Sequence, residues 1–394
     1  MTADRTLANG LRVLAIKHGR APVAEARLIL PAPCRTRETL AESVLLAACL
    51  SRGRVAEHGM ELDVAADVHQ LTATLSGPLD DLDTLVRGLA DVARGVPAEV
   101  DAARGQLVAR LALLRANPDL AMRAELARHL FGGHPVAFPM PGDDELAAIA
   151  EPRHRPAGPR GAVLVILAPD DPDRLADACE RAFEGWQDAS PLPPLPPLPG
   201  IGRGRLLPLP TPGAPQSRIR LRAPGVTVAD ERYPALFLAR DILGGSLSSR
   251  LSRSLREDKG YVYGVTAFFD HHPGAGFLSI EADTATATTR PALDVLFAEL
   301  DRMRTHPPTA DEIEAARAYA LGSAAVRLAP AVKLAGALAG LAAKAVDPLL
   351  LLGFPRRLAA VTPESVVEAA GRFFAPGSFS GVVAADPGEL TGLR

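Results

Sequence analysis

The sequence predicts an α+β protein built from two copies of one α/β-sandwich domain. Strand-like and helix-like patterns occur in both halves of the chain, and two short segments recur in order. AEVDAAR at 98–104 returns as DEIEAAR at 311–317, and APDDP at 168–172 returns as VAADP at 383–387. The offsets are nearly equal although the segments are far apart, which is typical of duplication. A chain of 394 residues is also longer than one hydrophobic core usually supports.

The boundary between the two copies is predicted at residues 191–200, PLPPLPPLPG. Proline cannot extend a helix or donate to a sheet, so this segment is expected to be a stiff, extended linker. We therefore assign an N-terminal domain to 1–190 and a C-terminal domain to 201–394. A proline-rich ligand for a partner domain is the alternative interpretation of the same segment.

In the first half of the sequence, segments with the two-residue periodicity of strands alternate with segments that have the 3.6-residue periodicity of helices. Residues 6–17 are predicted to form a hairpin around Asn9-Gly10. Alternating or continuous apolar runs predict strands at 23–30, 64–75 (two strands) and 162–167. Helical periodicity with terminal glycine or proline signals predicts helices at 39–50, 78–93, 99–115, 120–130 and 173–186. The most apolar segment, 334–352, contains Lys344, Asp347 and Pro348, and is predicted to be a buried helix rather than a membrane span.

Composition argues against several classes of partner. The formal net charge is −3 and only 4% of the residues are aromatic, so neither a basic surface nor a stacking platform for nucleic acid is expected. The N-terminus lacks the apolar region of a signal peptide, and the sequence contains no uncharged apolar stretch long enough to predict a membrane span. The three cysteines, Cys34, Cys49 and Cys179, are odd in number and are not spaced as metal ligands. We therefore expect a reducing, cytoplasmic setting.

Residues 242–269, ILGGSLSSRLSRSLREDKGYVYGVTAFF, are predicted to form a helix, a stop and a strand. Ser246 is a candidate helix cap, and Leu247, Leu251 and Leu255 are spaced to share one helix face. Gly260 supplies the C-terminal stop.

The strand that follows Gly260 alternates from Tyr261 onward. Tyr261, Tyr263, Val265 and Ala267 are predicted on one face, with Val262, Gly264, Thr266 and Phe268 on the other. A reversal of the chain at Gly260 would bring the Arg256 guanidinium and the Tyr263 phenol into one cleft. From these residues alone two interpretations stay open, because a terminal Arg often complements the helix dipole and a strand Tyr often packs in a core.

The same stretch resembles the C-terminal half of the pitrilysin/insulinase-type zinc peptidases, especially the mitochondrial processing peptidase-like branch. The family pattern is roughly L-G-G-x-x-S-S-R-L-x-x-x-L-R-E-x-x-G-x-x-Y, and the sequence follows it without a gap from Leu243 to Tyr263. The resemblance implies the fold of the mitochondrial processing peptidase/LuxS-like metallohydrolases. It also implies that Arg256 and Tyr263 are catalytic and substrate-binding residues, which bind the scissile carbonyl and its developing oxyanion.

The zinc half of the family site is missing from the sequence. Active members carry H-x-x-E-H on a helix, which supplies two metal ligands and a general base. The corresponding stretch is Val44-Leu45-Leu46-Ala47-Ala48, and the stretch that matches the third ligand, 107–111, offers Ala109 or Arg110 instead of Glu. We therefore expect no metal site in this chain. His134 lies in a G-x-H-P segment that the family also has, and a structural role is expected for it.

The resemblance thus implies the non-zinc subunit of a heterodimeric metallopeptidase, inactive alone. The expected partner is a zinc-bearing homologous subunit, and the expected substrate is a peptide. Zinc would come from the partner, while Arg256 and Tyr263 would come from this chain. The alternative is a non-catalytic peptide-binding, scaffold or regulatory protein of the same fold.

Overall fold

The computed structural model describes residues 1–52, 59–95, 99–187 and 192–393, and all structural statements concern these residues. The chain forms two compact units, and neither is continuous in sequence. Unit 1 comprises Met1–Ala116, Phe138–Pro197 and Arg327–Pro348, and unit 2 comprises Asn117–Ala137, Leu198–Val326 and Leu349–Arg394. The predicted helix stop at Gly53 and the start of the linker at Pro191 lie outside the described residues.

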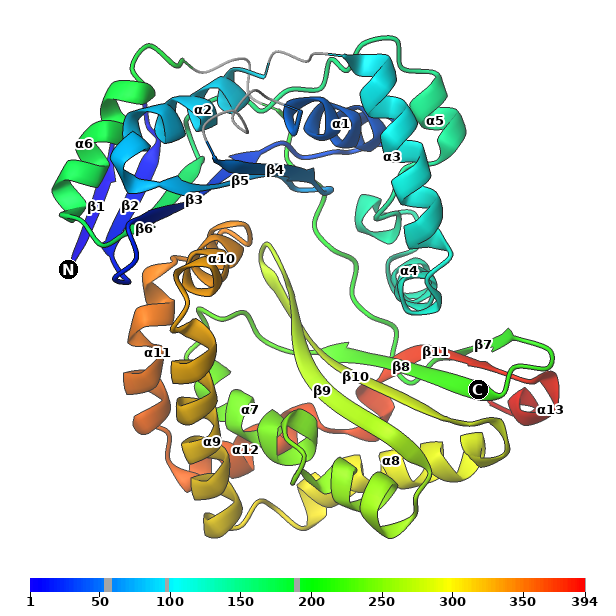
Figure 1. The fold of residues 1–394 in the computed structure, drawn as a ribbon. Coiled ribbons are helices and arrows are strands. Elements are labelled where there is room, and N and C mark those ends of the chain that lie inside the picture. Colours follow the sequence, from blue (N-terminus) through cyan, green and yellow to red (C-terminus); the bar gives the residue numbers. More distant parts are fainter. Residues whose placement is uncertain (53–58, 96–98, 188–191, 394) are drawn as a thin grey trace. The chain divides into compact units, whose positions relative to one another are not determined.

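Unit 1 contains a six-stranded sheet in the order β1-β2-β6-β3-β5-β4 (Figure 1). Its strands are β1 (Thr2–Thr6), β2 (Arg12–Lys17), β3 (Val23–Pro31), β4 (Glu61–Ala66), β5 (Gln70–Pro78) and β6 (Val163–Ala168). β2 pairs with β6 in parallel, and every other pair in this sheet is antiparallel. Each strand predicted in this half is present, and the Asn9-Gly10 turn joins β1 to β2 with Gly10 at a φ of 96°.

Helices cover both faces of this sheet. α2 (Leu82–Arg94) and α6 (Pro172–Ala182) lie on one face, where Leu28 and Ile166 join their apolar side chains in a common core. Ile29 and Leu167 point to the other face and are also buried. α10 (Ala331–Ala342), which comes from the C-terminal half of the sequence, packs on β3 and β6 at that other face (Figure 1).

The remaining helices of unit 1 lie beyond the edge strand β4. They are α1 (Arg37–Leu50), α3 (Val100–Arg115) and the short α5 (Asp143–Ala147). α1 begins at the capping residue Thr36, whose hydroxyl accepts from the Thr39 N–H at 3.1 Å. α1 is apolar on most sides because it packs against both β4 and α3, and Leu45 and Leu46 on adjacent faces are fully buried.

Unit 2 repeats the strand order and directions of unit 1. Its five-stranded sheet has the order β7-β11-β8-β10-β9, in which only β7 and β11 are parallel. The strands are β7 (Leu206–Pro210), β8 (Gln216–Pro224), β9 (Val262–His272), β10 (Ala275–Ala285) and β11 (Ser380–Ala385). They correspond in order to β2, β3, β4, β5 and β6, so the predicted duplicated α/β sandwich is confirmed.

The recurring sequence segments occupy equivalent places in the two units. Asp171 caps α6 and Asp386 caps α13 (Pro387–Leu390), each with a carboxylate that accepts a backbone N–H two residues later. Ala103 on α3 and Ala316 on α9 (Ala310–Leu328), which are 213 residues apart, are both buried. The repeats therefore reflect shared caps and shared packing positions.

Unit 2 is covered by helices from both halves of the sequence. α8 (Thr289–Thr305) lies on one face of the sheet, and α4 (Pro118–Phe131) lies on the other (Figure 1). α7 (Tyr233–Arg240), α11 (Leu349–Ala359) and α12 (Pro363–Phe373) complete the unit. Each unit thus contains one helix from the opposite half, and the predicted domain boundary at 191–200 stays a prediction.

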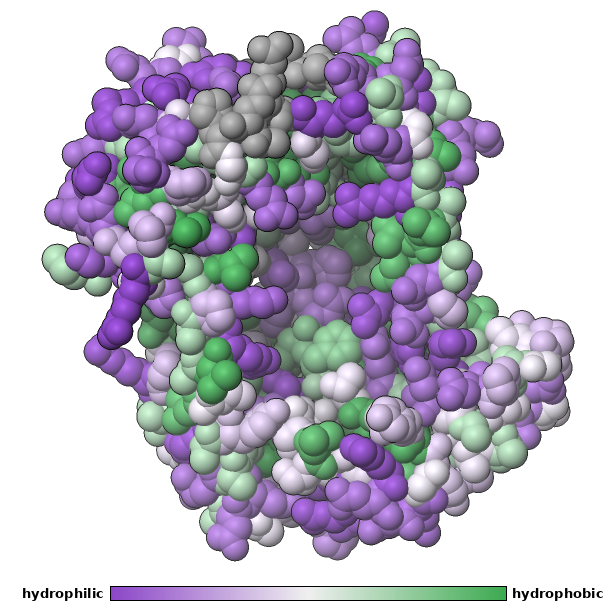
Figure 2. Space-filling model, in the orientation of Figure 1, coloured by the Kyte–Doolittle hydropathy of each residue, from purple (hydrophilic) through white to green (hydrophobic). Residues whose placement is uncertain are grey.

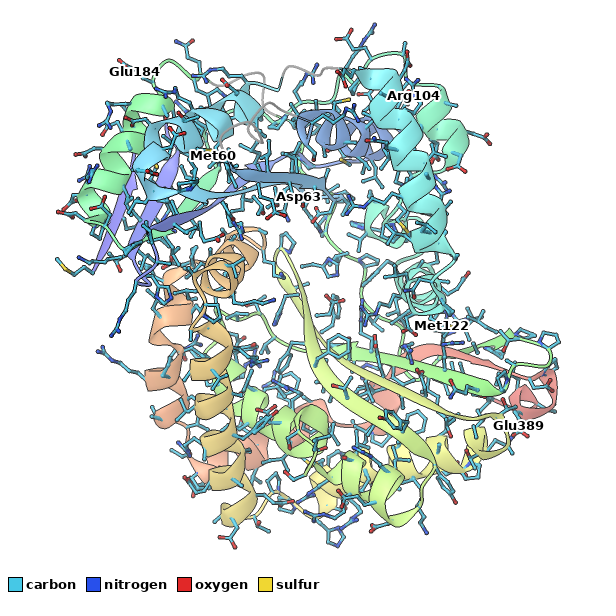
Figure 3. All side chains as sticks on the ribbon, in the orientation of Figure 1. Met60, Asp63, Arg104, Met122, Glu184 and Glu389 are labelled. Carbon is cyan, nitrogen blue, oxygen red and sulfur yellow. The ribbon has the colours of Figure 1, made fainter. Side chains whose placement is uncertain are left out.

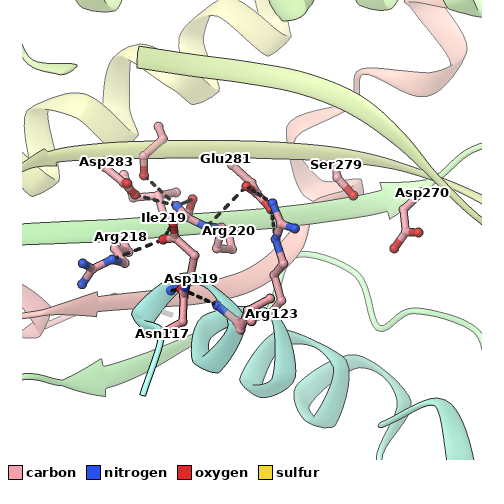
Figure 4. A network of polar contacts seen from close by, with 12 residues as sticks. Asn117, Asp119, Arg123, Arg218, Ile219, Arg220, Asp270, Ser279, Glu281 and Asp283 are labelled. Atoms are coloured by element: carbon pink, nitrogen blue, oxygen red, sulfur yellow. Dashed lines mark hydrogen bonds and ion pairs between the residues drawn. The ribbon is translucent and has the colours of Figure 1, made fainter. Parts of the chain in front are cut away.

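An ionic network fixes α4 to the sheet of unit 2 (Figure 4). Arg220 on β8 is only 3% exposed and donates to Asp119 of α4 at 3.0 Å and to Asp283 of β10 at 2.7 Å. Arg123, one turn further along α4, pairs with Glu281 of β10 at 3.1 Å. Arg218 and Arg222, at the neighbouring alternate positions of β8, also have acidic partners, Asp119 and Asp270. A buried guanidinium requires such a partner.

The apolar segment 334–352 is not one helix, so that prediction is wrong. α10 ends at Ala342, Ala345 takes a left-handed φ of 55°, and α11 starts after Asp347-Pro348. A proline at this position disfavours continuation of the preceding helix. Among the described residues no single helix has the length and apolar character to cross a membrane. The pair α9 and α10 has them jointly but is bent by 111°. The face shown in Figure 2 is mainly hydrophilic, with hydrophobic residues in smaller groups.

Candidate functional site

Arg256 and Tyr263 lie on either side of the turn at Gly260. The helix that carries Arg256 ends in a π-helical segment, Ser252–Asp258, and β9 begins at Val262. Gly260 has a φ of 64°, and its N–H donates to the Arg256 carbonyl at 3.2 Å. The Tyr261 N–H donates to the Leu255 carbonyl at 2.8 Å. A left-handed residue closes the helix as predicted, and the chain then reverses into the strand.

The predicted start of this helix is wrong by about one turn. Ser249, rather than Ser246, caps it, because the Ser249 hydroxyl accepts from the Ser252 N–H at 3.4 Å. Ser246 is extended, and the Ser249 N–H donates to its carbonyl in a turn that precedes the helix. Leu247 therefore lies outside the helix and is 75% exposed, whereas Leu251 and Leu255 are buried as expected.

Two glycines allow close approach just before this turn. A Cβ on Gly244 would lie 2.9 Å from the Cβ of Ala267 on β9, nearer than side chains normally pack. A Cβ on Gly245 would meet the ion pair of Arg240 and Asp241. The Gly-Gly of the family pattern thus brings the chain against β9.

A β-bulge aims Tyr263 away from the sheet. β9 is the outermost strand next to β10, and the pairing steps from Thr284 opposite Val262 to Asp283 opposite Gly264. Tyr263 is the extra residue. The predicted two-face alternation is broken here, because Val262 and Ala267 both end up buried although they are an odd number of residues apart.

The structure brings the predicted pair together at the surface of unit 2. The guanidinium carbon of Arg256 lies 5.7 Å from the centroid of the Tyr263 ring, within cation–π range. Arg256 is exposed and Tyr263 is 90% exposed. The guanidinium N–H groups and the phenol O–H are both donors, and both can reach an external acceptor such as a carbonyl oxygen.

A third residue of the family pattern, Arg250, anchors this helix. Its guanidinium pairs with both carboxylate oxygens of Glu312 and donates to the His306 carbonyl at 2.8 Å. Glu312 was not among the residues predicted from the sequence. Thr309 and Glu312 form a capping box at the start of α9, so the T-x-x-E signature is the sequence signal that would have identified it.

In unit 1 the positions of the missing zinc ligands surround a cavity of about 420 Å³. Val44, Ala47 and Ala48 line it from α1, because positions three and four apart share a helix face. α3 contributes Leu107, Arg110 and Leu111, whereas Ala109 points to solvent. The structure thus selects Arg110, rather than Ala109, as the residue that faces the former metal position.

The side chains around this cavity do not fit a zinc ion. Zinc requires nitrogen, sulfur or carboxylate ligands at about 2.0–2.3 Å, and valine and alanine provide none. Within the described part of the chain, no group of three or more His, Cys, Asp and Glu side chains is arranged to hold a metal. Of the histidines, His134 is buried, and its Nδ1 accepts from the Val136 N–H at 3.2 Å, which is a structural contact.

Sequence comparison finds a likeness to a known family. Residues 157–319, which include Arg256 and Tyr263, match the family model of the peptidase M16 inactive domain. An uncharacterised zinc protease of Streptomyces coelicolor is 27% identical over 291 residues. The central part of the chain is therefore similar to the peptidase M16 family. The alignment with the Streptomyces relative covers 68% of this chain and 61% of the length of the relative.

Solved structures agree on the M16 fold. The crystal structure of a peptidase M16 inactive domain from Pseudomonas fluorescens superposes with a TM-score of 0.85 at 20% identity, over 98% of each chain. A chain of Complex III2 from Candida albicans gives a TM-score of 0.81 at 17% identity, over 100% of this chain and 97% of that one. At these identities the likeness concerns the fold, and the predicted fold type is confirmed.

Proposed function

We propose that this chain is a peptidase M16-type protein and the non-zinc subunit of a heterodimeric metallopeptidase. The observation that carries the proposal is the exposed Arg256–Tyr263 pair at the bulge of β9, in a chain that has Val44, Ala47, Ala48 and Arg110 at the positions of the family's metal site. The pair is built by a helix stop, a bulge and two close-packed glycines. The chain therefore retains the donors of a peptidase site and lacks its metal.

In the proposed assembly a homologous subunit with an intact H-x-x-E-H motif holds the zinc. Arg256 and Tyr263 donate hydrogen bonds to the carbonyl oxygen of the scissile peptide bond. These bonds strengthen as the oxygen gains negative charge, and an oxyanion donor of this kind is worth about 2.7–4 kcal/mol. The chain alone then has no hydrolytic activity, although it contributes to transition-state stabilisation in the heterodimer.

The decisive experiment is Tyr263→Phe in the assembled heterodimer. The substitution removes the phenol donor but keeps the ring beside Arg256, so kcat/KM is expected to fall by roughly 10²-fold. Tyr319→Phe is the matched control, because it removes another exposed phenol, on α9, and should leave turnover unchanged. Assembly must be measured on the same preparations by size-exclusion chromatography.

Normal assembly with normal turnover in Tyr263→Phe would contradict the proposal. That outcome would favour the scaffold or peptide-binding alternative, in which the pair is retained but unused. Failed assembly would instead assign Tyr263 a structural role.

We also propose a reducing, cytoplasmic setting for this subunit. Its three cysteines are unpaired and buried, and burial raises the pKa of Cys34 to about 11 and that of Cys179 to about 12. Thiols of this kind are unreactive toward disulfide exchange. Mass spectrometry of protein alkylated directly in lysed cells should show all three as free thiols, and a disulfide among them would contradict this setting.

A further inference from the structure

Unit 1 has a cavity at the position where the family resemblance places a metal, and its side chains do not fit a zinc ion. We propose that it binds the C-terminal residue of a peptide, with a large apolar side chain in the cavity and the terminal carboxylate on Arg110. This inference extends the proposed function. The peptide is a substrate only if the proposed function holds. Binding itself requires only this chain.

Most of the side chains that line the cavity are apolar. Its volume of about 420 Å³ lies within the range of small-molecule sites and is suited to one large side chain. Side chains from α1 and α3 and from the segment before α5 form the apolar wall: Val44, Ala47, Ala48, Leu107, Leu111, Leu114, Pro139 and Met140. Burial of an aliphatic or aromatic side chain against this wall supplies the affinity.

The charges around the cavity favour a carboxylate on the side of α3. Arg52 is already used, since it pairs with Glu99 and donates to the Gln106 side chain. Arg110 is exposed and has no ion pair or hydrogen bond within the described chain. Asp63 lies across the cavity on β4 (Figure 3). A carboxylate is therefore attracted to α3 and repelled from β4, which orients the ligand.

The edge of the sheet indicates a chain end rather than an internal segment. β4 is the outermost strand, but Ser51 at the end of α1 occupies its open edge. The Ser51 hydroxyl accepts from the Val64 N–H at 2.9 Å. Its Oγ lies 3.0 Å from the carbonyl oxygen of Val64 and 3.0 Å from that of Ala47, and it can donate to either. An extended peptide cannot pair continuously along β4 past this point, because its hydrogen-bonding groups would find those of Val64 already satisfied.

The test measures binding of acetyl-Gly-Ser-Gly-Leu to the isolated full chain by isothermal titration calorimetry. The peptide acid should bind at least about tenfold more tightly than its C-terminal amide, because only the acid forms a charged pair with guanidinium. A C-terminal Ser in place of Leu should also weaken binding. Equal affinities of acid and amide, or no binding at millimolar peptide, would overturn the proposal.

Two substitutions locate the site. Arg110→Gln should lower the affinity for the acid to that for the amide, and Arg87→Gln, which removes an exposed guanidinium on α2, is the matched control. Ala48→Phe should fill the cavity and abolish binding of both forms, with circular dichroism as the check on folding. If Arg110→Gln binds the acid as tightly as the parent, the site lies elsewhere and the proposal is wrong.

Dodecanoate provides the remaining comparison. If it binds in an Arg110-dependent manner while the peptide acid does not, the cavity is an acyl-chain site and the peptide assignment fails. Because these measurements need neither partner nor turnover, they are independent of the Tyr263→Phe result.

Discussion

Arg250 and Glu312 face each other fork to fork, with Nε to Oε1 at 2.8 Å and Nη2 to Oε2 at 2.7 Å. The contact joins the helix that carries Arg256 to the first turn of α9. Bidentate pairs fix geometry as well as contributing energy. The placement of Arg256 thus depends on Glu312, a residue 56 positions later in the chain.

We expect Glu312→Gln to destabilise unit 2 in a pH-dependent manner. The hydrogen bonds from Arg250 are the main cause that lowers the pKa of Glu312 from 4.5 to about 2, against an opposing effect of burial. The contribution of a depressed carboxyl pKa is fully present above the unfolded value and is lost as pH falls through the folded value. The difference in unfolding free energy between parent and variant should therefore shrink between about pH 4.5 and pH 2. Urea titrations at several pH values measure it, and a constant difference across this range would argue against the ion pair as its source.

Arg256→Lys should lower kcat/KM of the heterodimer by about tenfold or more, because an ammonium cannot reproduce the planar guanidinium fork. Arg253→Lys is the control, since Arg253 is exposed on the same helix and lies outside the pair. Partner affinity should be unchanged in both variants. Equal losses of turnover in the two would show a general effect of this helix.

The purified chain alone should contain no stoichiometric zinc and show no peptidase activity. Val44, Ala47, Ala48 and Arg110 stand where ligands would be needed. Inductively coupled plasma mass spectrometry after dialysis against a mild chelator tests this. About one retained zinc per chain would contradict it.

Limited proteolysis should first cut within 187–203 and give two fragments of similar size. Residues 192–200 contain no helix or strand. The fragments should nevertheless co-elute under native conditions, because α4 is fixed to unit 2 by Asp119 and α10 packs on unit 1. First cuts inside 98–115 or 311–328 would contradict the predicted boundary.

Periodicity and capping signals predicted most helices and strands of the first half, since they are local properties of the chain. The equal spacing of two recurring segments was enough to predict the duplication. The sheet on which α4 and α10 each pack was not predictable, because an apolar helix face does not indicate which sheet it will cover. The bulge at Tyr263 was missed for a similar reason: it exists only in the register between β9 and β10.

Residues that lie within the motif stretch could be predicted from the sequence. Glu312 lies outside that stretch and acts by holding Arg250, so it could not be predicted in the same way. The proximity of Arg256 and Tyr263 across the turn at Gly260 was predicted from their order in one stretch, and their role stays a prediction. Glu312 was missed, although its capping signature was present. The choice between Ala109 and Arg110 required the orientation of α3 toward the cavity, which the mixed apolar and charged sequence of this helix does not reveal.

The late arrival of α10 has a consequence for synthesis on the ribosome. The face of the first sheet that carries Ile29 and Leu167 has no cover until Ala342 has been translated. At the usual elongation rate of roughly 5–20 residues per second, the nascent sheet waits about 9–35 s after Ala168 emerges. During that interval a flat apolar surface is open to solvent and to other nascent chains. The first half of this protein is therefore the part that we expect chaperones to hold while the second half is being made.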